Sequence, residues 1–523
     1  MSDSVRVYSG QKKNLGKPRR RRSRKGLVLL MLLLIGAAWV YWTTRDTHRL
    51  ESLIPADKAY HAVVDDVFAR RARLAQSQVW DALPPQLGLA DVPQKLSQDV
   101  GLPQWVLNNL VPGACYITGD DIKGFGDALA VTRMTRVGVL LDRLRVFFPS
   151  IKEDYAGGLE LRRVGDLYYA VRGRVLLLSA SRRRLVEALT LLAEDAVGAD
   201  DLAQMRQSLG ENDIYGRFQL AETDPGGAVV ERGTFALRIG GKEAAVQCAA
   251  QVRPAWREEM AGLLDGVEPK TLEAPPDGMV RLSLNLGRPV EALWQSAGTA
   301  LGKEEQMREM WAQWASPDED GDTTVPQMVL GLLGGLGPGV RLSLVGVDLN
   351  EIVPAPELVA TLDADSVALA EVFAQLPEPP SGVEQWETWP RYDKEAQVVR
   401  LPLIGGPSLE PTGGIKGGNF VMSSSRTVAE SVLADAATAN PPSLPKPANF
   451  YAQIRPYECG KAAFDTAMLL AEAKLLKGYN PETLNEAYQP WLKKAAAVKQ
   501  LSALAAYDAG ALTLECQMEC AAK

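Results

Sequence analysis

The residue types that most often carry catalysis are scarce in this sequence. Only two histidines, His48 and His61, occur among 523 residues, so a Ser-His-Asp or Cys-His arrangement would have to use one of them. His61 lies in KAYHAVVDD, an alternating pattern in which Asp65 falls on the same strand face. The pattern is typical of a partly buried strand histidine, and we therefore predict no catalytic residue and no enzymatic activity.

Two serines in RVLLLSASRRRLVEAL (174–189) stand where some hydrolases place a nucleophile, between an apolar run and an amphipathic segment. The apolar residues that follow have the i, i+3, i+4, i+7 spacing of a helix face, and a serine before a helix accepts a hydrogen bond from its first turn. The same pattern recurs at Ser423 and Ser425. Because a duplicated nucleophile without histidine partners is not expected, we interpret Ser179 and Ser181 as helix-starting residues.

The acidic segment SPDEDGDTT (316–324) is the best candidate for a metal site. Asp318, Asp320 and Asp322 occupy alternate positions, which resembles the opening of a calcium loop. The EF-hand pattern then requires Gly at the sixth position and Glu at the twelfth, where this sequence has Thr323 and Val329. We predict a solvated acidic loop and no metal or cofactor, with a weak calcium site at the three aspartates as the alternative.

Paired carboxylates could support a different chemistry. Glycosidases use two carboxyl groups about 5–10 Å apart, and acidic pairs occur at Asp65 and Asp66 and at Asp120 and Asp121. In QWETWPRYD (385–393), Trp386 and Trp389 could form a sugar-stacking edge, although their packing in a core or interface is the preferred interpretation. A carboxylate-based envelope glycan hydrolase is therefore the alternative function.

The five cysteines, at positions 115, 248, 459, 516 and 520, are an odd number. Cys516 and Cys520 lie four residues apart in the strand-like LTLECQMEC, and about 13 Å separates such residues on a strand, too far for a disulfide. A bond between Cys459 and one of them stays open. We prefer free thiols buried in apolar strands.

The N-terminal region combines a basic tail with an apolar run. Residues 1–25 hold ten Lys or Arg and one acid, so the remaining residues carry a net charge of −16. This acidic remainder is a poor partner for nucleic acid. LVLLMLLLIGAAWVYW (27–42) predicts an uncleaved transmembrane helix over 26–43, with 1–25 in the cytoplasm and the bulk outside it. A signal peptide cleaved near GAA (36–38) is the competing interpretation.

Five pairs of segments indicate an internal duplication. In each pair a segment of the first part of the chain resembles one of the second part, in the same order: IPADKAYHAVVDD (54) and APPDGMVRLSLNL (274), PGACYITGDDI (112) and PGVRLSLVGVDL (338), LLLSASRRRLVEAL (176) and FVMSSSRTVAESVL (420), NDIYGRFQL (212) and ANFYAQIRP (448), AAVQCAAQV (244) and LTLECQMEC (512). Chance similarity of short amphipathic segments is the alternative. The predicted halves are 44–270 and 271–523.

The predicted fold class is α+β, with a single transmembrane helix followed by two similar halves of antiparallel sheet and interspersed helices. Period-two alternation, as in GTFALRIGGKEAAVQCAAQV (233–252), indicates antiparallel strands with one face covered. Gly240 and Gly241 in this segment mark a tight hairpin, and helices are expected at 182–194 and at about 460–477.

The anchor, the IPAD start, PGACYITGDDI, LYYAVRGRVLLLSASRRRL and LGGLGPGVRLSLVG together resemble a family of uncharacterised bacterial membrane-anchored proteins with an extracytoplasmic domain of unknown function. The resemblance implies a single-pass protein of the bacterial cytoplasmic membrane and provides no catalytic residues. Our hypothesis is a non-catalytic envelope protein whose duplicated ectodomain binds a protein, a lipid or an envelope polymer.

Overall fold

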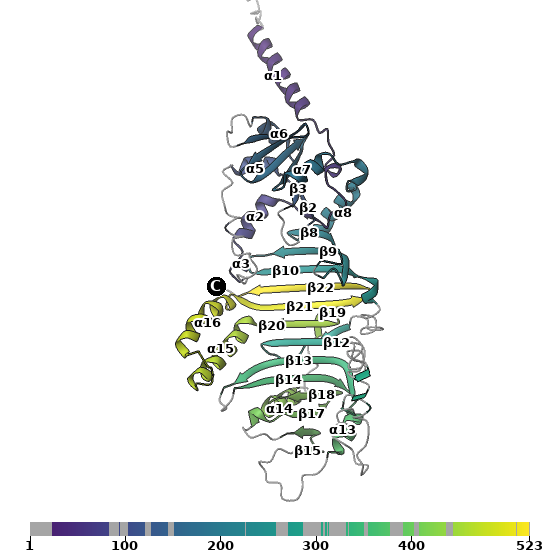
Figure 1. Ribbon diagram of the computed structural model, residues 1–523, viewed down its shortest axis with the longest axis vertical. Coiled ribbons are helices and arrows are strands. Elements are labelled where there is room, and N and C mark those ends of the chain that lie inside the picture. The colour runs from purple at the N-terminus through teal and green to yellow at the C-terminus, as the bar shows by residue number, and fades with distance from the viewer. Residues whose placement is uncertain are drawn as a thin grey trace, which may run out of the picture.

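Of the 22 strands in the described chain, 20 belong to one antiparallel sheet. In this computed structural model the structure describes residues 24–82, 94, 103–120, 127–144, 151–224, 226–257, 270–285, 305–306, 309–310, 312, 331–332, 334–349, 354–376, 391–401, 407–435, 443–508 and 510–521. The central strands lie one above the other along the long axis of the molecule (Figure 1).

One part of the sheet comes from the first half of the chain. From the outer edge to the centre its pairings give the order β4 (Lys152–Ala156), β5 (Leu159–Val164), β6 (Leu167–Arg172), β7 (Val175–Ser179), β3 (Leu129–Arg133), β2 (Cys115–Gly119), β1 (Tyr60–Val64), β8 (Ile214–Gln219), β9 (Val230–Ile239), β10 (Glu243–Val252).

The other part comes from the second half of the chain. From the centre outward its order is β22 (Ala511–Cys520), β21 (Val498–Asp508), β20 (Phe450–Ile454), β12 (Val280–Asn285), β13 (Leu336–Asp348), β14 (Ala355–Ala364), β18 (Asn419–Ser423), β17 (Thr412–Lys416), β16 (Val398–Arg400), β15 (Arg391–Asp393).

The two strand orders are identical when each is counted outward from the centre. Each half begins at the centre with its last three sheet strands in reverse chain order. Its first three sheet strands follow in chain order, and the remaining four follow in reverse chain order. Each of the five segment pairs compared in the sequence falls on matching positions: β1 with β12, β2 with β13, β7 with β18, β8 with β20, and β10 with β22.

The two parts join through β10 and β22, and this corrects the predicted fold class. β10 pairs with β22 from Glu243↔Glu519 to Gln251↔Ala511, so the predicted two halves form one continuous sheet rather than two. The physical reason is that the edge of each half offers unpaired backbone N–H and C=O groups, which are satisfied by the other edge. In Figure 1 the yellow C-terminal strands lie directly beside the teal β10.

Because directly opposed residues point to the same side of a sheet, the register defines two faces. Face A carries Val246 of β10 and Cys516 of β22, and face B carries their neighbours Gln247 and Glu515. On face B, α7 (Arg182–Leu189) and α8 (Ala199–Leu209) cover a core that contains Val63, Tyr116 and Leu177. A two-stranded ribbon of β11 (Lys270–Glu273) and β19 (Ser443–Ala448) contributes Leu272 and Leu444 to a smaller cluster with Tyr451 and Leu504 of face B.

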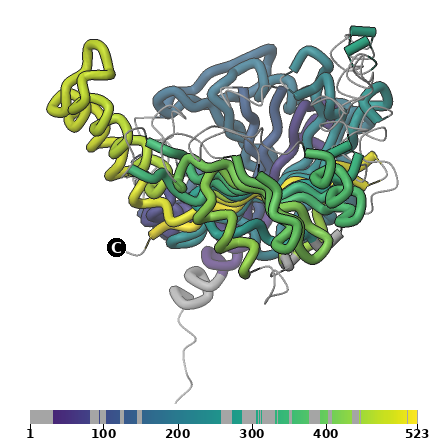
Figure 2. Tube along the Cα trace, turned by 90° about the horizontal axis from the view of Figure 1, so that it is seen from below, coloured from purple at the N-terminus to yellow at the C-terminus, as the bar shows by residue number. Residues whose placement is uncertain are grey.

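Helices cover face A mainly at its two ends. In the first half these are α5 (Gln104–Leu110) and α6 (Arg136–Arg143) over the outer strands, and α2 (Val67–Ala75) and α3 (Val79–Ala82) near β9. In the second half α13 (Ser366–Ala374) packs on Phe420 and Leu336 of face A. On the opposite side of the sheet, α14 (Arg426–Asp435) packs on Val359 and Val421 of face B. Helices α15 (Pro456–Glu472) and α16 (Pro481–Ala495) extend away from the sheet to one side (Figure 2).

The predicted transmembrane helix is also corrected. Residues Arg24–Thr43 form helix α1, which extends from one end of the molecule (Figure 1). Within the described ranges, no helix combines the length and the apolar character needed to cross a membrane. The apolar run of 16 residues, at about 1.5 Å per residue, measures about 24 Å, which is shorter than the roughly 30 Å hydrocarbon core of a bilayer.

Candidate functional site

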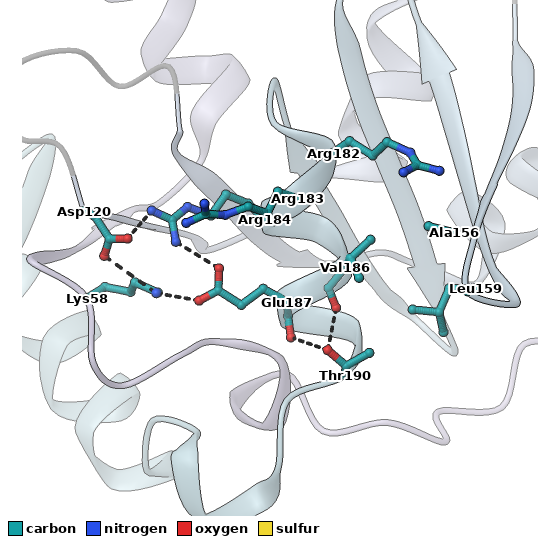
Figure 3. Close-up of a pocket in the computed structure, with 11 residues that line it drawn as sticks. Lys58, Asp120, Ala156, Leu159, Arg182, Arg183, Arg184, Val186, Glu187 and Thr190 are labelled. Atoms are coloured by element: carbon teal, nitrogen blue, oxygen red, sulfur yellow. Dashed lines mark hydrogen bonds and ion pairs between the residues drawn. The ribbon is translucent and has the colours of Figure 1, made fainter.

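A cavity of about 850 Å³, lined in part by charged side chains, lies beside the first turn of α7. Figure 3 shows Lys58, Asp120, Arg184 and Glu187 on one side of it, with Arg182, Ala156 and Leu159 on the other. Lys58 precedes β1, Asp120 follows β2, and both Arg184 and Glu187 lie on α7. The pairing of β1 with β2 therefore brings Lys58 and Asp120 together, beside Arg184 and Glu187 of α7.

The four side chains form a closed ring of alternating charges. Lys58 Nζ lies 2.5 Å from Glu187 Oε1 and 3.6 Å from Asp120 Oδ1. Arg184 completes the ring through Glu187 Oε2 at 2.9 Å and through Asp120. The Lys58 and Arg184 side chains are buried. Each cation therefore has two carboxylate partners inside the ring, which ties the start of β1 and the end of β2 to α7.

This charge ring is unsuited to acid catalysis. Burial opposes ionisation of Glu187, but hydrogen bonds from Lys58 and Arg184 outweigh it and lower the pKa of this carboxyl group. Burial likewise opposes the charge of Lys58, and its hydrogen bond to Glu187 still raises the pKa of the ammonium group. A glycosidase acid needs a raised carboxyl pKa. Lys58 and Arg184 instead hold Glu187 ionised, and both cations are paired with carboxylates inside the ring.

The serines considered as nucleophiles have local structural roles. Ser179 is buried; its hydroxyl donates to the carbonyl of Ala128 at 2.8 Å and accepts from the Ser181 N–H at 3.0 Å. The turn repeats in the second half, where the hydroxyl of Ser423 accepts from the Ser425 N–H at 3.2 Å. Ser181 is the N-cap residue of α7 but its side chain makes no capping bond, so Ser179 stabilises the turn.

The histidines lie apart from these serines. His61 Nε2 is 3.3 Å from the Ala56 carbonyl, and the ring shares face B with Arg217 and Thr118, which oppose it in β8 and β2. Burial lowers the pKa of His61. His48 Nδ1 is 2.9 Å from the Thr47 hydroxyl.

The structure also locates the carboxylates and cysteines. Asp65 pairs with Arg206 at 3.1 Å, and Asp66 stands before α2 in the left-handed conformation.

All five cysteines are free thiols, so no disulfide joins Cys459 to Cys516 or Cys520. Asp121, Asp318, Asp320, Asp322, Trp386 and Trp389 lie outside the described residues. Within the part of the chain that is described, no group of three His, Cys, Asp or Glu residues could hold a metal ion.

A second hollow, of about 610 Å³, lies on face A where the two halves of the chain meet. Its floor crosses β9, β10, β22, β21, β20 and β12, and Val79 and Trp80 of α3 line one end. We call it the apolar groove. Its face A side chains are all apolar: Leu237, Ile239, Ala244, Val246, Val280, Ala452, Ile454, Leu501, Ala503, Cys516 and Met518.

The floor of the apolar groove is open to solvent in the described chain. Val246, Ile454 and Leu501 are 41%, 37% and 36% exposed. The backbone groups beneath them are paired in the sheet, so among the described side chains the floor offers no charge, and its one hydrogen-bond donor is the weak thiol of Cys516. Exposed contiguous apolar surface usually marks a binding site in a soluble domain. The described elements leave this central part of face A uncovered.

The apolar groove was not predicted from the sequence. The sequence contains its signal as alternating apolar residues in AAVQC, LSALAA and LECQM, but this alternation by itself predicts only strands with one apolar side. Finding it required knowing that β9 and β10 of one half lie beside β20, β21 and β22 of the other.

Comparisons with known proteins place the chain in no family. No protein-family model and no curated protein matches it. Solved structures of TP0453 match weakly: crystal form I is 7% identical with a TM-score of 0.26, over 40% of this chain and 80% of that one. Crystal form III is 6% identical with a TM-score of 0.24, over 45% and 91%. Likeness at this level carries no argument about fold or function.

Proposed function

We propose that this protein is a non-catalytic lipid-binding protein that holds the acyl part of a lipid in the apolar groove. The observation that carries the proposal is the uniformly apolar, solvent-open floor formed jointly by both halves of the sheet. Its volume of about 610 Å³ falls within the range of small-molecule sites, roughly 300–1,000 Å³. An alkyl chain needs no hydrogen bond, and the described floor provides only the weak thiol donor of Cys516.

The composition of the groove favours an acyl chain over a protein partner. Protein interfaces carry about one hydrogen bond per 100–200 Å² and are enriched in Tyr, Trp and Arg. The face A lining is instead aliphatic or sulfur-containing, and Trp80 of α3 is the one aromatic residue among the described residues that line the groove. An aliphatic trough without polar anchors matches an alkyl chain better than it matches a protein surface.

The alternative of a glycan hydrolase has no support from the described carboxylates. Asp120 and Glu187 are paired with Lys58 and Arg184, and among the described residues no tryptophan lines their cavity. The location in a bacterial envelope, with the bulk of the chain outside the cytoplasm, stays a prediction from the sequence. Lipid binding is compatible with that location and does not depend on it.

The proposal is tested by titrating the delipidated full chain with a fluorescent fatty acid. Val246→Asp places a carboxylate on the groove floor, and we expect the affinity to fall at least about tenfold because a charge resists contact with an alkyl chain. Ala249→Asp is the matched control, since Ala249 is exposed on the same strand but points to face B. Its affinity should equal that of the wild type.

Thermal unfolding of both variants establishes that each is folded. Absence of saturable binding by the wild type, or equal losses in the two variants, would overturn the proposal. Native mass spectrometry of the chain purified without detergent gives a second readout, and it should detect lipid on the wild type and less on Val246→Asp.

A further inference from the structure

The apolar surface of face A continues well past the groove, over β13, β14 and β18. Leu342, Leu358 and Met422 are 40%, 51% and 48% exposed there. The register places them in the same two cross-strand rows as the groove floor. The first row is Met422, Ala360, Leu342, Leu282, Ala452, Ala503, Cys516, Val246, Leu237, and the second is Leu358, Leu344, Val280, Ile454, Leu501, Met518, Ala244, Ile239. We call the two rows together the apolar strip.

The two ends of the apolar strip differ in whether a helix covers them. At β9 it is closed by α3, where Val79 is buried against Ile239 and Trp80 packs on the same cluster. Trp80 is held in place by a hydrogen bond from Nε1 to the Leu74 carbonyl at 2.5 Å. At the other end Met422 and Leu358 are about half exposed. A ligand that enters the groove is therefore stopped at α3 and free to extend toward β18.

The length of the apolar strip exceeds one acyl chain. It crosses nine strands, and at about 4.8 Å between neighbouring strands its length is about 38 Å. The hydrocarbon core of a bilayer is about 30 Å thick, so an ordinary acyl chain that fills one leaflet reaches about 15 Å. The groove alone, over six strands, measures about 24 Å. A single chain therefore covers less than half of the strip, whereas two chains that extend in opposite directions from one head group cover about 30 Å of it.

We propose that the ligand is a lipid with more than one acyl chain, lying across the strands from α3 toward β18. This inference rests on the proposed function and names its substrate class. The groove holds the first part of the alkyl surface, and Leu342, Leu358 and Met422 contact the part that extends beyond it. A free fatty acid, in contrast, is accommodated by the groove without these three residues.

The experiment compares two probes on the delipidated full chain. One is palmitate; the other is phosphatidylglycerol supplied from phosphatidylglycerol–phosphatidylethanolamine vesicles, which are then removed by gel filtration before the retained lipid is counted. The variants are Leu358→Ser and Met422→Ser, on separate strands and both exposed, so that failure of one to fold leaves the other informative. We expect each to reduce phosphatidylglycerol retention about tenfold and palmitate affinity less than twofold.

The outcomes separate this inference from the proposed function. If neither probe binds the wild type, the proposed function itself fails. If palmitate binds but phosphatidylglycerol is not retained, or if the two variants weaken both probes equally, the ligand is a single chain and the inference is wrong. If the protein elutes with the vesicles and retains no lipid of its own, the strip binds a bilayer surface instead, which also overturns it.

Discussion

Gln247 and Glu515 lie directly opposite each other where β10 pairs with β22. They are also equivalent positions of the two similar segments, because AAVQCAAQV begins at 244 and LTLECQMEC at 512. A residue that pairs with its own counterpart in an antiparallel ladder marks a local two-fold axis. The two halves of the sheet are thus related by an approximate two-fold axis at this pair, and the apolar groove lies across it on the other face.

The central pairing predicts a specific cross-link. In a Cys248→Ala, Cys516→Ala background, Gln247→Cys with Glu515→Cys should form an intramolecular disulfide on mild oxidation, because directly opposed Cβ atoms are about 4.5–5.5 Å apart. Peptide mass spectrometry of the unreduced digest detects it. Gln247→Cys with Ala511→Cys, about 13 Å apart along the strand direction, should not cross-link. Equal yields from both pairs would contradict the register.

A buried carboxylate holds α2 against the sheet, and its removal should be costly. Asp213 is fully buried and accepts hydrogen bonds from Arg70 Nη1 at 2.9 Å, from the Ile239 N–H at 2.7 Å and from Arg73. We expect Asp213→Ala to lower the free energy of unfolding by about 3–5 kcal/mol, because two arginines lose their partner. Urea denaturation measures this change.

The control for Asp213 is an exposed ion pair in the same half. Asp201 is 54% exposed and lies 3.1 Å from Arg217, so Asp201→Ala should change the free energy of unfolding by less than about 1 kcal/mol. A loss of the same size in both variants would show that Asp213 is not the stabilising contact described.

The turn before α7 gives a test that separates structure from catalysis. Ser179→Ala removes the hydroxyl that bonds the Ala128 carbonyl and the Ser181 N–H, and we expect a loss of about 1–3 kcal/mol in the free energy of unfolding. Ser181→Ala, whose side chain makes no capping bond, should stay within about 0.5 kcal/mol. The reverse ranking in urea denaturation would mean that Ser181 stabilises the turn.

The charge ring predicts a dependence of stability on pH. Hydrogen bonds from Lys58 and Arg184 overcome burial and depress the pKa of Glu187 below its usual value of 4.5. The ionised carboxylate therefore stabilises the fold above about pH 4.5, and this contribution is lost as the pH falls through the lower pKa of the folded state. The melting temperature of Glu187→Gln should fall below that of the wild type at pH 7, and the difference should shrink below pH 4.5. A constant difference from pH 7 to pH 3 would exclude this linkage.

Local patterns in the sequence predicted much of the sheet. The alternation in GTFALRIGGKEAAVQCAAQV corresponds to β9 and β10 with their turn at Gly240 and Gly241, and the helix expected at 182–194 begins at Arg182 and ends earlier, at Leu189. Ser179 and Ser181 do lie at the start of this helix, but the bond that stabilises the turn comes from Ser179 rather than from a cap at Ser181. The prediction that residues 26–43 form a transmembrane helix was wrong.

The sequence by itself determined the properties that depend on composition and on neighbouring residues. These are the scarcity of histidine, the strand periodicity, and the resemblance between the segments around Cys248 and Cys516. What only the tertiary structure decided is that β10 and β22 pair. Strand edges pair through backbone groups that every residue carries, so the side-chain pattern does not specify which edge will meet which. That single pairing merges two sheets into one and sets Val246 beside Cys516, and the apolar groove exists only because of it.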